Sequence, residues 1–101
     1  MATKFTAHKH DLAGDFSITG VVKQLASLTN TLKKLEINQN RKLHVDCTRI
    51  SRIDMSGLQL LHVWKECARM RGVEPQLINL PEHMHRAIQS MGLERSFMDL
   101  T

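Results

Sequence analysis

The segment Asp54-Met55-Ser56-Gly57 places a carboxylate, a small hydroxyl side chain and a glycine immediately before an apolar run. The spacing from Ser56 to Gln59 matches a capping box, in which the serine accepts a hydrogen bond from the backbone at the start of a helix. The same position suits a modified serine, because a phosphate would bring a charge of about −1.5 to −2 to that helix start. Local spacing leaves a structural cap and a regulatory phosphoacceptor both open.

A modified serine would change how this segment meets another protein. Asp54 would repel a phosphate on Ser56, and so would any partner surface complementary to a neutral hydroxyl. We expect Gly57 to keep the backbone accessible to that partner. The prediction is a surface that allows docking while Ser56 is neutral and prevents docking once it is charged.

Other reactive groups do not assemble into a recognisable catalytic or metal-binding motif. The sequence has no Walker loop, no GxGxxG and no GxSxG around Ser56, so we do not expect an enzyme. Cys47 and Cys67 lie twenty residues apart, without CxxC or zinc-ligand spacing. The histidines are read as surface residues, and Trp64 is read as part of the core. We therefore expect no metal and no cofactor.

The charge balance favours a solvated surface over a nucleic-acid interface. Fourteen Lys and Arg against ten Asp and Glu give a net charge of +4, but the basic residues are scattered and stacking aromatics are scarce. A preference for an acidic partner stays open. The N-terminus is polar, and no apolar run approaches the ~20 residues that span a bilayer. We expect a cytoplasmic protein without direct membrane insertion, folded as one domain over residues 1–101.

Hydrophobic periodicity predicts alternating strands and helices. Residues 4–10 and 16–18 read as two short strands of a hairpin, with a turn at 11–15. A helical stripe follows that should lie on a sheet, formed by Val21, Leu25, Leu28, Leu32 and Leu35. Residues 43–47 alternate as a central strand, 48–55 read as a loop, and a second helix begins near Ser56 and ends before Gly72.

The remaining elements complete an α/β pattern. Residues 76–78 form a short strand, Pro81 opens a third helix that Gly92 ends, and the last residues form a half-helix or strand. Strands joined through helices are expected to run parallel. The predicted fold is a small mixed sheet with amphipathic helices packed mainly on one face.

The stretch VDCTRISRIDMSGLQLL, residues 45–61, resembles the signature of the STAS domain family. That signature is a strand ending in an Asp, a loop with two apolar anchors, and then Asp-x-Ser-Gly-Leu opening a helix. The anchors here are Ile50 and Ile53. The resemblance covers roughly residues 12–93 and implies a STAS-like fold. Met55 departs from the pattern, because many members carry a second hydroxyl before the acceptor serine.

Within this family the closer resemblance is to the anti-sigma factor antagonists. It implies that Ser56 is phosphorylated by an anti-sigma factor that is also a serine protein kinase, and that the partner rather than this chain binds ATP. The unphosphorylated chain would sequester that kinase through a surface formed by Asp54, Met55, Ser56, Gly57 and Leu58. The alternative is an accessory subunit or adaptor of a lipid-transport ATPase complex, without phosphorylation switching.

Overall fold

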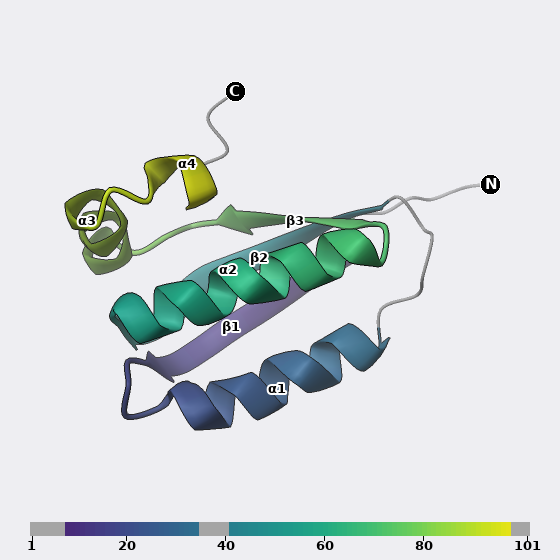
Figure 1. Ribbon diagram of the computed structural model, residues 1–101, viewed down its shortest axis with the longest axis horizontal. Helices are drawn as coiled ribbons and strands as arrows, with labels where there is room; N and C mark the ends of the chain where they lie inside the picture. The colour runs from purple at the N-terminus through teal and green to yellow at the C-terminus, as the bar shows by residue number, and fades with distance from the viewer. Residues whose placement is uncertain (1–7, 35–40, 98–101) are drawn as a thin grey trace.

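The computed structural model describes residues 8–34 and 41–97 and shows alternating strands and helices (Figure 1). Three strands and four helices occur within these residues. In chain order they are β1 (His8–Phe16), α1 (Val21–Lys34), β2 (Arg41–Ile53), α2 (Met55–Met70), β3 (Val73–Ile78), α3 (Glu82–Ser90) and α4 (Glu94–Phe97). The predicted alternation of strands and helices is confirmed from the first helix onward.

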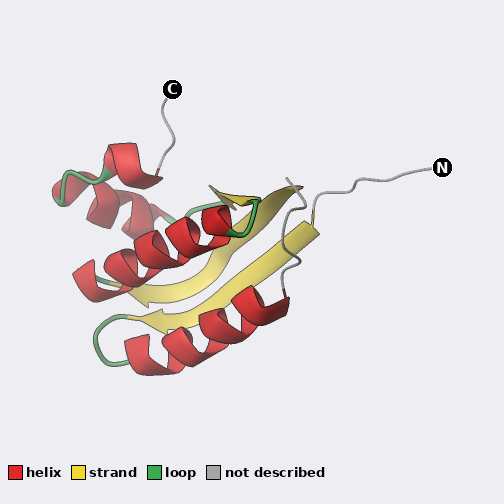
Figure 2. Cartoon of the chain, turned by 45° about the vertical axis from the view of Figure 1, so that its right-hand side comes forward, coloured by secondary structure: helices red, strands yellow, loops and turns green. Residues whose placement is uncertain are grey.

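The sheet has the order β1-β2-β3, with β2 in the centre. Both strand pairs are parallel: His10 pairs with Val45, and Val45 pairs with Leu77. Figure 2 shows α1 and α2 lying on the same side of this sheet, while α3 and α4 lie near the end of β3. The expected STAS-like α/β fold, with helices mainly on one face, is confirmed. Within the described residues the sheet is parallel throughout, rather than mixed.

The core lies between the helix-covered face of the sheet and the inner faces of the helices. Leu43, Val45 and Cys47 alternate along β2 and are buried, whereas His44 and Asp46 between them are half-buried. This confirms the predicted alternation of residues 43–47 and their central place in the sheet. The helices contribute further buried side chains, namely Leu28, Leu58, Leu61, Trp64, Ala68, Met84 and Ile88.

The predicted N-terminal hairpin is wrong where the structure describes it. Residues 11–15, read as a turn, belong to the single strand β1, and residues 17–20 form the connection to α1. Leu12 and Phe16 are buried, so this strand is held by the core as well as by pairing with β2. Gly14 takes the positive φ that suggested a turn, at 100°, but it does so within the strand, beside a shift in register. Residues 4–7 of the predicted edge strand lie outside the described residues.

Two further expectations need correction. Residues 48–53, read as a loop, extend β2 to Ile53, because they continue to pair with β1 through register shifts that the periodicity does not reveal. On α1, Leu28 is buried, but Leu25 is 51% exposed. The helix therefore meets the core along a narrower stripe than its leucine spacing predicts. Leu35 lies outside the described residues.

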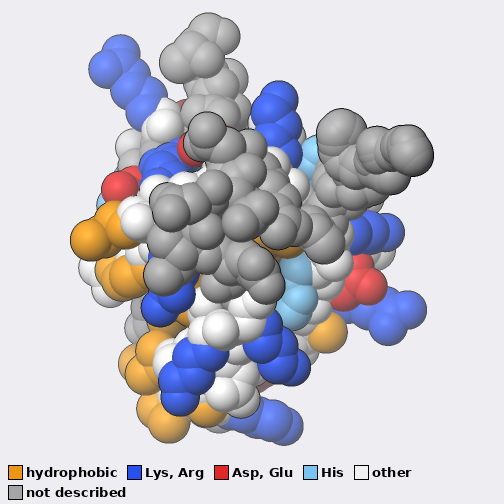
Figure 3. All heavy atoms as spheres, turned by 90° about the vertical axis from the view of Figure 1, so that its right-hand side faces the viewer, with side chains coloured by type: hydrophobic (Ala, Val, Ile, Leu, Met, Phe, Trp, Pro, Cys, Tyr) orange, Lys and Arg blue, Asp and Glu red, His pale blue; other side chains and the backbone are white. Residues whose placement is uncertain are grey.

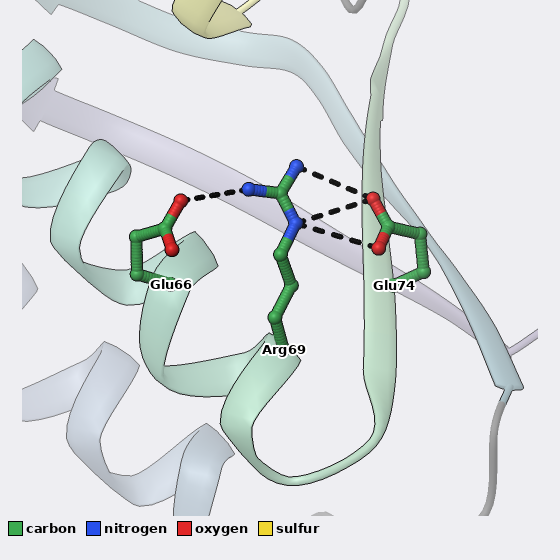
Figure 4. A network of polar contacts seen from close by, with 3 residues as sticks. All are labelled: Glu66, Arg69 and Glu74. Atoms are coloured by element: carbon green, nitrogen blue, oxygen red, sulfur yellow. Dashed lines mark hydrogen bonds and ion pairs between the residues drawn. The ribbon is translucent and has the colours of Figure 1, made fainter.

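The end of α2 is fixed by polar contacts to β3. Arg69 donates to both carboxylate oxygens of Glu74, at 3.3–3.4 Å, and to Glu66 one turn earlier at 2.7 Å (Figure 4). Gly72 follows with φ of 82°, as predicted for the residue that ends the helix. Pro81 is the residue preceding α3 rather than part of its first turn. Gly92, with φ of 66°, follows the end of that helix as expected.

Candidate functional site

Asp54, not Ser56, caps the start of α2. Asp54 has extended backbone angles, and its Oδ1 accepts hydrogen bonds from the backbone N–H groups of Ser56 at 2.9 Å and Gly57 at 3.3 Å. The capping-box interpretation of Ser56 is therefore wrong. Asp54 immediately follows β2 and already has the short acceptor side chain that a helix start requires. The helix consequently begins one residue earlier, at Met55.

Ser56 is left with a hydroxyl group that the fold does not use. It is the second residue of α2 and is half-buried. Among the residues that the structure describes, its Oγ makes no hydrogen bond, since only the backbone N–H of Ser56 is engaged with Asp54. Removing this hydroxyl should cost the fold little. A phosphate or a partner group would not have to displace an internal hydrogen bond of the hydroxyl.

Gly57 and Leu58 face the interior of the protein. Leu58 has no exposed area, and Gly57 is buried with the backbone carbonyl of Phe16 against it, so closely that any Cβ at position 57 would overlap this oxygen. The interpretation that Gly57 keeps the backbone accessible to a partner is wrong. Its role here is to let α2 approach the end of β1. Of the five predicted contact residues, Asp54, Met55 and Ser56 retain exposed area.

The turn between β1 and α1 is joined to the start of α2. Asp54 Oδ2 accepts a hydrogen bond of 2.8 Å from the backbone N–H of Ile18, across 36 positions of sequence. This hydrogen bond, together with those from Gly57 and Ser56, holds the pKa of Asp54 below its usual value, so the carboxylate is ionised at neutral pH. The carboxyl ends of two neighbouring strands thereby form one surface.

The same surface contains a second acid that is already paired. Asp15 Oδ1 accepts from the backbone N–H of Ser17 at 2.8 Å, and Arg52 lies 3.9 Å from the other carboxylate oxygen. The hydrogen bonds from Ser17 lower the pKa of Asp15. Asp54 and Asp15 are therefore both anionic, and a phosphate on Ser56 would be added to the negative charge of the adjacent Asp54.

Exposed apolar side chains lie next to Ser56. Met55 is 41% exposed and lines an apolar groove of about 540 Å³ between α2 and the C-terminal elements, together with Leu58, Gln59, His62, Val63, Leu93 and Phe97. Ile18, on the neighbouring turn, is 66% exposed. The surface around Ser56 thus combines an unbonded hydroxyl, the anionic carboxylate of Asp54 and apolar contact area.

Asp46 lies on the other face of the sheet and is engaged within the fold. Its Oδ1 accepts from the backbone N–H and hydroxyl of Thr48, and its Oδ2 accepts from Asn79 at 3.0 Å and lies 3.5 Å from Lys9. The hydrogen bonds from Thr48 are the main cause of a pKa well below the usual range. These contacts make Asp46 a cap for the residues that follow it in β2.

The remaining reactive residues serve the core or the surface. Trp64 is buried and donates from its ring N–H to the carbonyl of Leu28, at 3.2 Å, which confirms its predicted place in the core. Burial raises the pKa of the Cys47 thiol to about 12, so it is not a reactive thiolate. Within the described part of the chain, no three His, Cys, Asp or Glu side chains gather as a metal site would require.

Basic charge does not form a continuous patch on the face seen in Figure 3, where Lys and Arg side chains are spread over several separate regions. Arg52 and Arg69 are paired with carboxylates, and Arg86 lies 3.5 Å from Glu82 one helical turn away. This distribution agrees with the solvated surface that the sequence predicts. The expectation that the chain does not bind nucleic acid stays a prediction.

Sequence reasoning missed Ile18 and the Asp54–Ile18 contact. The sequence carries no local signal for it, because the two residues are 36 positions apart and Ile18 takes part through its backbone. The contact could have been predicted from the parallel arrangement of β1 and β2. Parallel neighbours place their carboxyl ends at the same edge of a sheet, so the segments that follow them meet there.

Comparisons with known proteins agree with this architecture. A comparison with curated protein sequences finds no similar relative. Among solved structures, a sulfate transporter family protein from Wolinella succinogenes superposes with a TM-score of 0.71 at 17% identity, over 95% of this chain and 75% of that one. This likeness supports the fold alone. In the described part of the chain, no helix combines the length and apolarity of a membrane span. Residues 5–100 match the family model described as "Mlab, STAS domain", and the chain therefore belongs to the STAS domain family.

Proposed function

We propose that this STAS domain is an anti-sigma factor antagonist, a protein-binding module controlled by phosphorylation of Ser56. The observation that carries the proposal is the Ser56 hydroxyl, which is half-buried at the start of α2 and makes no hydrogen bond within the described residues. The fold keeps this serine in place without using its side chain. A serine held in this way is suited to modification or to contact with a partner.

The surroundings of Ser56 explain how a phosphate would act on binding. With a neutral serine, Met55 and the adjoining apolar groove offer contact area that a partner can desolvate at low cost. A phosphate adds about two negative charges next to the Asp54 carboxylate. Burying that combined charge in an interface carries a desolvation penalty, which is several kcal/mol for a single ion without a partner. Binding and release follow from the charge of one side chain.

The proposed partner is an anti-sigma factor that is also a serine protein kinase, with ATP bound by the partner. The chain itself acts by binding and not by catalysis, and the proposal requires no cofactor, no nucleic-acid contact and no membrane insertion. Since sigma factors act on cytoplasmic transcription, the proposal places the chain in the cytoplasm. Asp54, Met55 and Ser56 form the direct contact, while Gly57 and Leu58 support it from inside the fold.

The test is phosphorylation by an anti-sigma serine kinase from the same genome, with Mg²⁺ and ATP. We expect the intact mass of the wild-type chain to increase by one phosphate, and peptide mapping to place it on Ser56. The Ser56→Ala variant is the matched control, because it removes a hydroxyl without an internal partner. An unmodified chain, or a phosphate that persists in this variant, overturns the proposal.

A second candidate is an adaptor subunit of a lipid-transport ATPase complex, without a phosphorylation switch. One comparison favours keeping it: the matching family model is described as "Mlab, STAS domain". The start of α2 would then be a constant contact surface. Titration against the purified transport ATPase separates the two candidates. An adaptor binds it with similar affinity whether Ser56 is kept or replaced by alanine, and it is not modified by the kinase.

A further inference from the structure

A single carboxylate holds three backbone donors from two distant parts of the chain. Asp54 Oδ1 accepts from Ser56 and Gly57, and Oδ2 accepts from Ile18 at 2.8 Å. Every one of these donors is a backbone N–H, so the arrangement depends on both oxygens of one carboxylate acting as acceptors. The turn after β1 and the start of α2 share this acceptor.

A phosphate on Ser56 would find the nearby amides occupied. The N–H groups of Ser56 and Gly57 already donate to the Asp54 side chain, and Leu58 donates to the Asp54 carbonyl at 3.0 Å. A doubly charged phosphate at the second position of α2 attracts the same N–H groups and repels the carboxylate beside it. The two anions therefore compete for one set of donors.

We propose that Asp54 is a positioning residue that couples Ser56 to the turn between β1 and α1, such that negative charge on Ser56 displaces the Asp54 carboxylate and releases the Ile18 amide. This inference rests on the proposed function, since it describes how modification of Ser56 spreads to a second segment. The regulated surface then includes the turn at residues 17–20 as well as the start of α2.

The contacts of the turn limit how far the change extends. Ser17 donates its N–H to Asp15 at 2.8 Å, and Gly20 donates to the Ser17 carbonyl at 2.9 Å, independently of Asp54. Release of Ile18 therefore loosens one residue and leaves the turn folded. Ile18 is 66% exposed, so its side chain is free to change position when its backbone hydrogen bond is lost.

The experiment uses the isolated chain, with amide hydrogen exchange and amide proton shifts measured by NMR for three variants. Ser56→Glu adds negative charge, and Ser56→Gln is its neutral control of the same size. Asp54→Asn serves as the reference for a lost Ile18 contact. Its amide oxygen still accepts from the helix start, because Asn is as good a cap as Asp. Its NH₂ group cannot replace the second acceptor that Ile18 uses.

We expect exchange at Ile18 to accelerate by about tenfold in Ser56→Glu and in Asp54→Asn, the change that loss of a hydrogen bond of about 1.4 kcal/mol produces. In Ser56→Gln the Ile18 amide should exchange at the wild-type rate. The Ser17 and Gly20 amides should stay protected from exchange in all variants. Equal exchange rates of the Ile18 amide in the Glu and Gln variants overturn the proposal. A wild-type exchange rate of this amide in Asp54→Asn overturns it as well. Failure of the proposed function appears separately, as absent phosphorylation by the kinase.

Discussion

The backbone carbonyl of Phe16, at the end of β1, lies directly against the Cα of Gly57 in the first turn of α2. Phe16 is fully buried, and Gly57 is buried beside it. A glycine at position 57 is the condition for this approach, since no other residue leaves room for the oxygen. The glycine in the Ser56-Gly57 pair is thus explained by packing inside the chain, and the serine beside it is not.

Substitution of Gly57 by alanine should destabilise the fold strongly. The new Cβ overlaps backbone rather than a flexible side chain, so α2 must shift away from β1. We expect a loss of about 3 kcal/mol in the free energy of unfolding, measured by chemical denaturation. Ser56→Ala is the neighbouring control and should stay within about 0.5 kcal/mol of the wild type. Similar stability for the two variants would contradict the close approach.

Trp64 should stabilise the packing of α2 against α1 through its ring N–H as well as its area. Trp64→Phe keeps an aromatic ring but removes the hydrogen bond to the Leu28 carbonyl. We expect a loss of about 1–3 kcal/mol in the free energy of unfolding. Because Trp64 is the only tryptophan, circular dichroism must follow the transition. Leu28→Ala, which opens a cavity at the same contact, should cost about 2–5 kcal/mol. A free energy of unfolding of Trp64→Phe equal to that of the wild type would rule out a contribution of this hydrogen bond to stability.

Acid should weaken the fold partly through Asp46. Its pKa is lowered in the folded state, mainly by hydrogen bonds from Thr48 and then by one from Asn79. Such a group stabilises the fold above its unfolded pKa of about 3.9, and this contribution is lost as the pH falls toward the folded value. Melting temperatures between about pH 6 and pH 2 should therefore fall more steeply for the wild type than for Asp46→Asn.

Thr48→Val and Asn79→Gly provide the controls for this pH dependence. Each removes a side-chain donor to Asp46, and glycine suits the positive φ of 55° at position 79. Both variants should show a pH dependence between those of the wild type and Asp46→Asn. If melting temperature falls with pH equally steeply in all four proteins, Asp46 does not contribute to the acid sensitivity of the fold.

Met55 should contribute to partner binding if the proposed function holds. Met55 and Met70 are both exposed methionines of α2, but Met55 adjoins Ser56 and Met70 is the last residue of the helix. We expect Met55→Lys to weaken association with the anti-sigma kinase at least about tenfold, the loss of about 1.4 kcal/mol of apolar contact. Met70→Lys should bind as the wild type does, by isothermal titration calorimetry. Equal affinities would exclude the helix start from the interface.

Much of the fold could be predicted from the sequence, because helix periodicity and the alternation in β2 are local patterns with a clear physical cause. Leu43, Val45, Cys47 and Trp64 are buried as expected. The exceptions are the second half of β2, which was read as a loop, and β1, where residues 11–15 were read as a turn. The strand conformation of both segments is set by the pairing of β1 with β2, and that pairing is not visible in local sequence.

The candidate site was predicted in part. The position of Ser56 at a helix start follows from the motif, but the choice of Asp54 over Ser56 as cap depends on where β2 ends, and β2 is longer than expected. The burial of Gly57 depends on the path of β1, which was also predicted incorrectly. These errors share one cause: each concerns a contact between segments that are far apart in sequence.

The parallel arrangement has a consequence for the rate of folding. His10 pairs with Val45, and Val45 pairs with Leu77, so each strand must find a neighbour more than thirty residues away. No hairpin occurs in the described sheet to act as an early local nucleus. Because the chain loses loop-closure entropy before these pairings form, we expect the sheet to assemble late and α1 and α2 to acquire helical structure first.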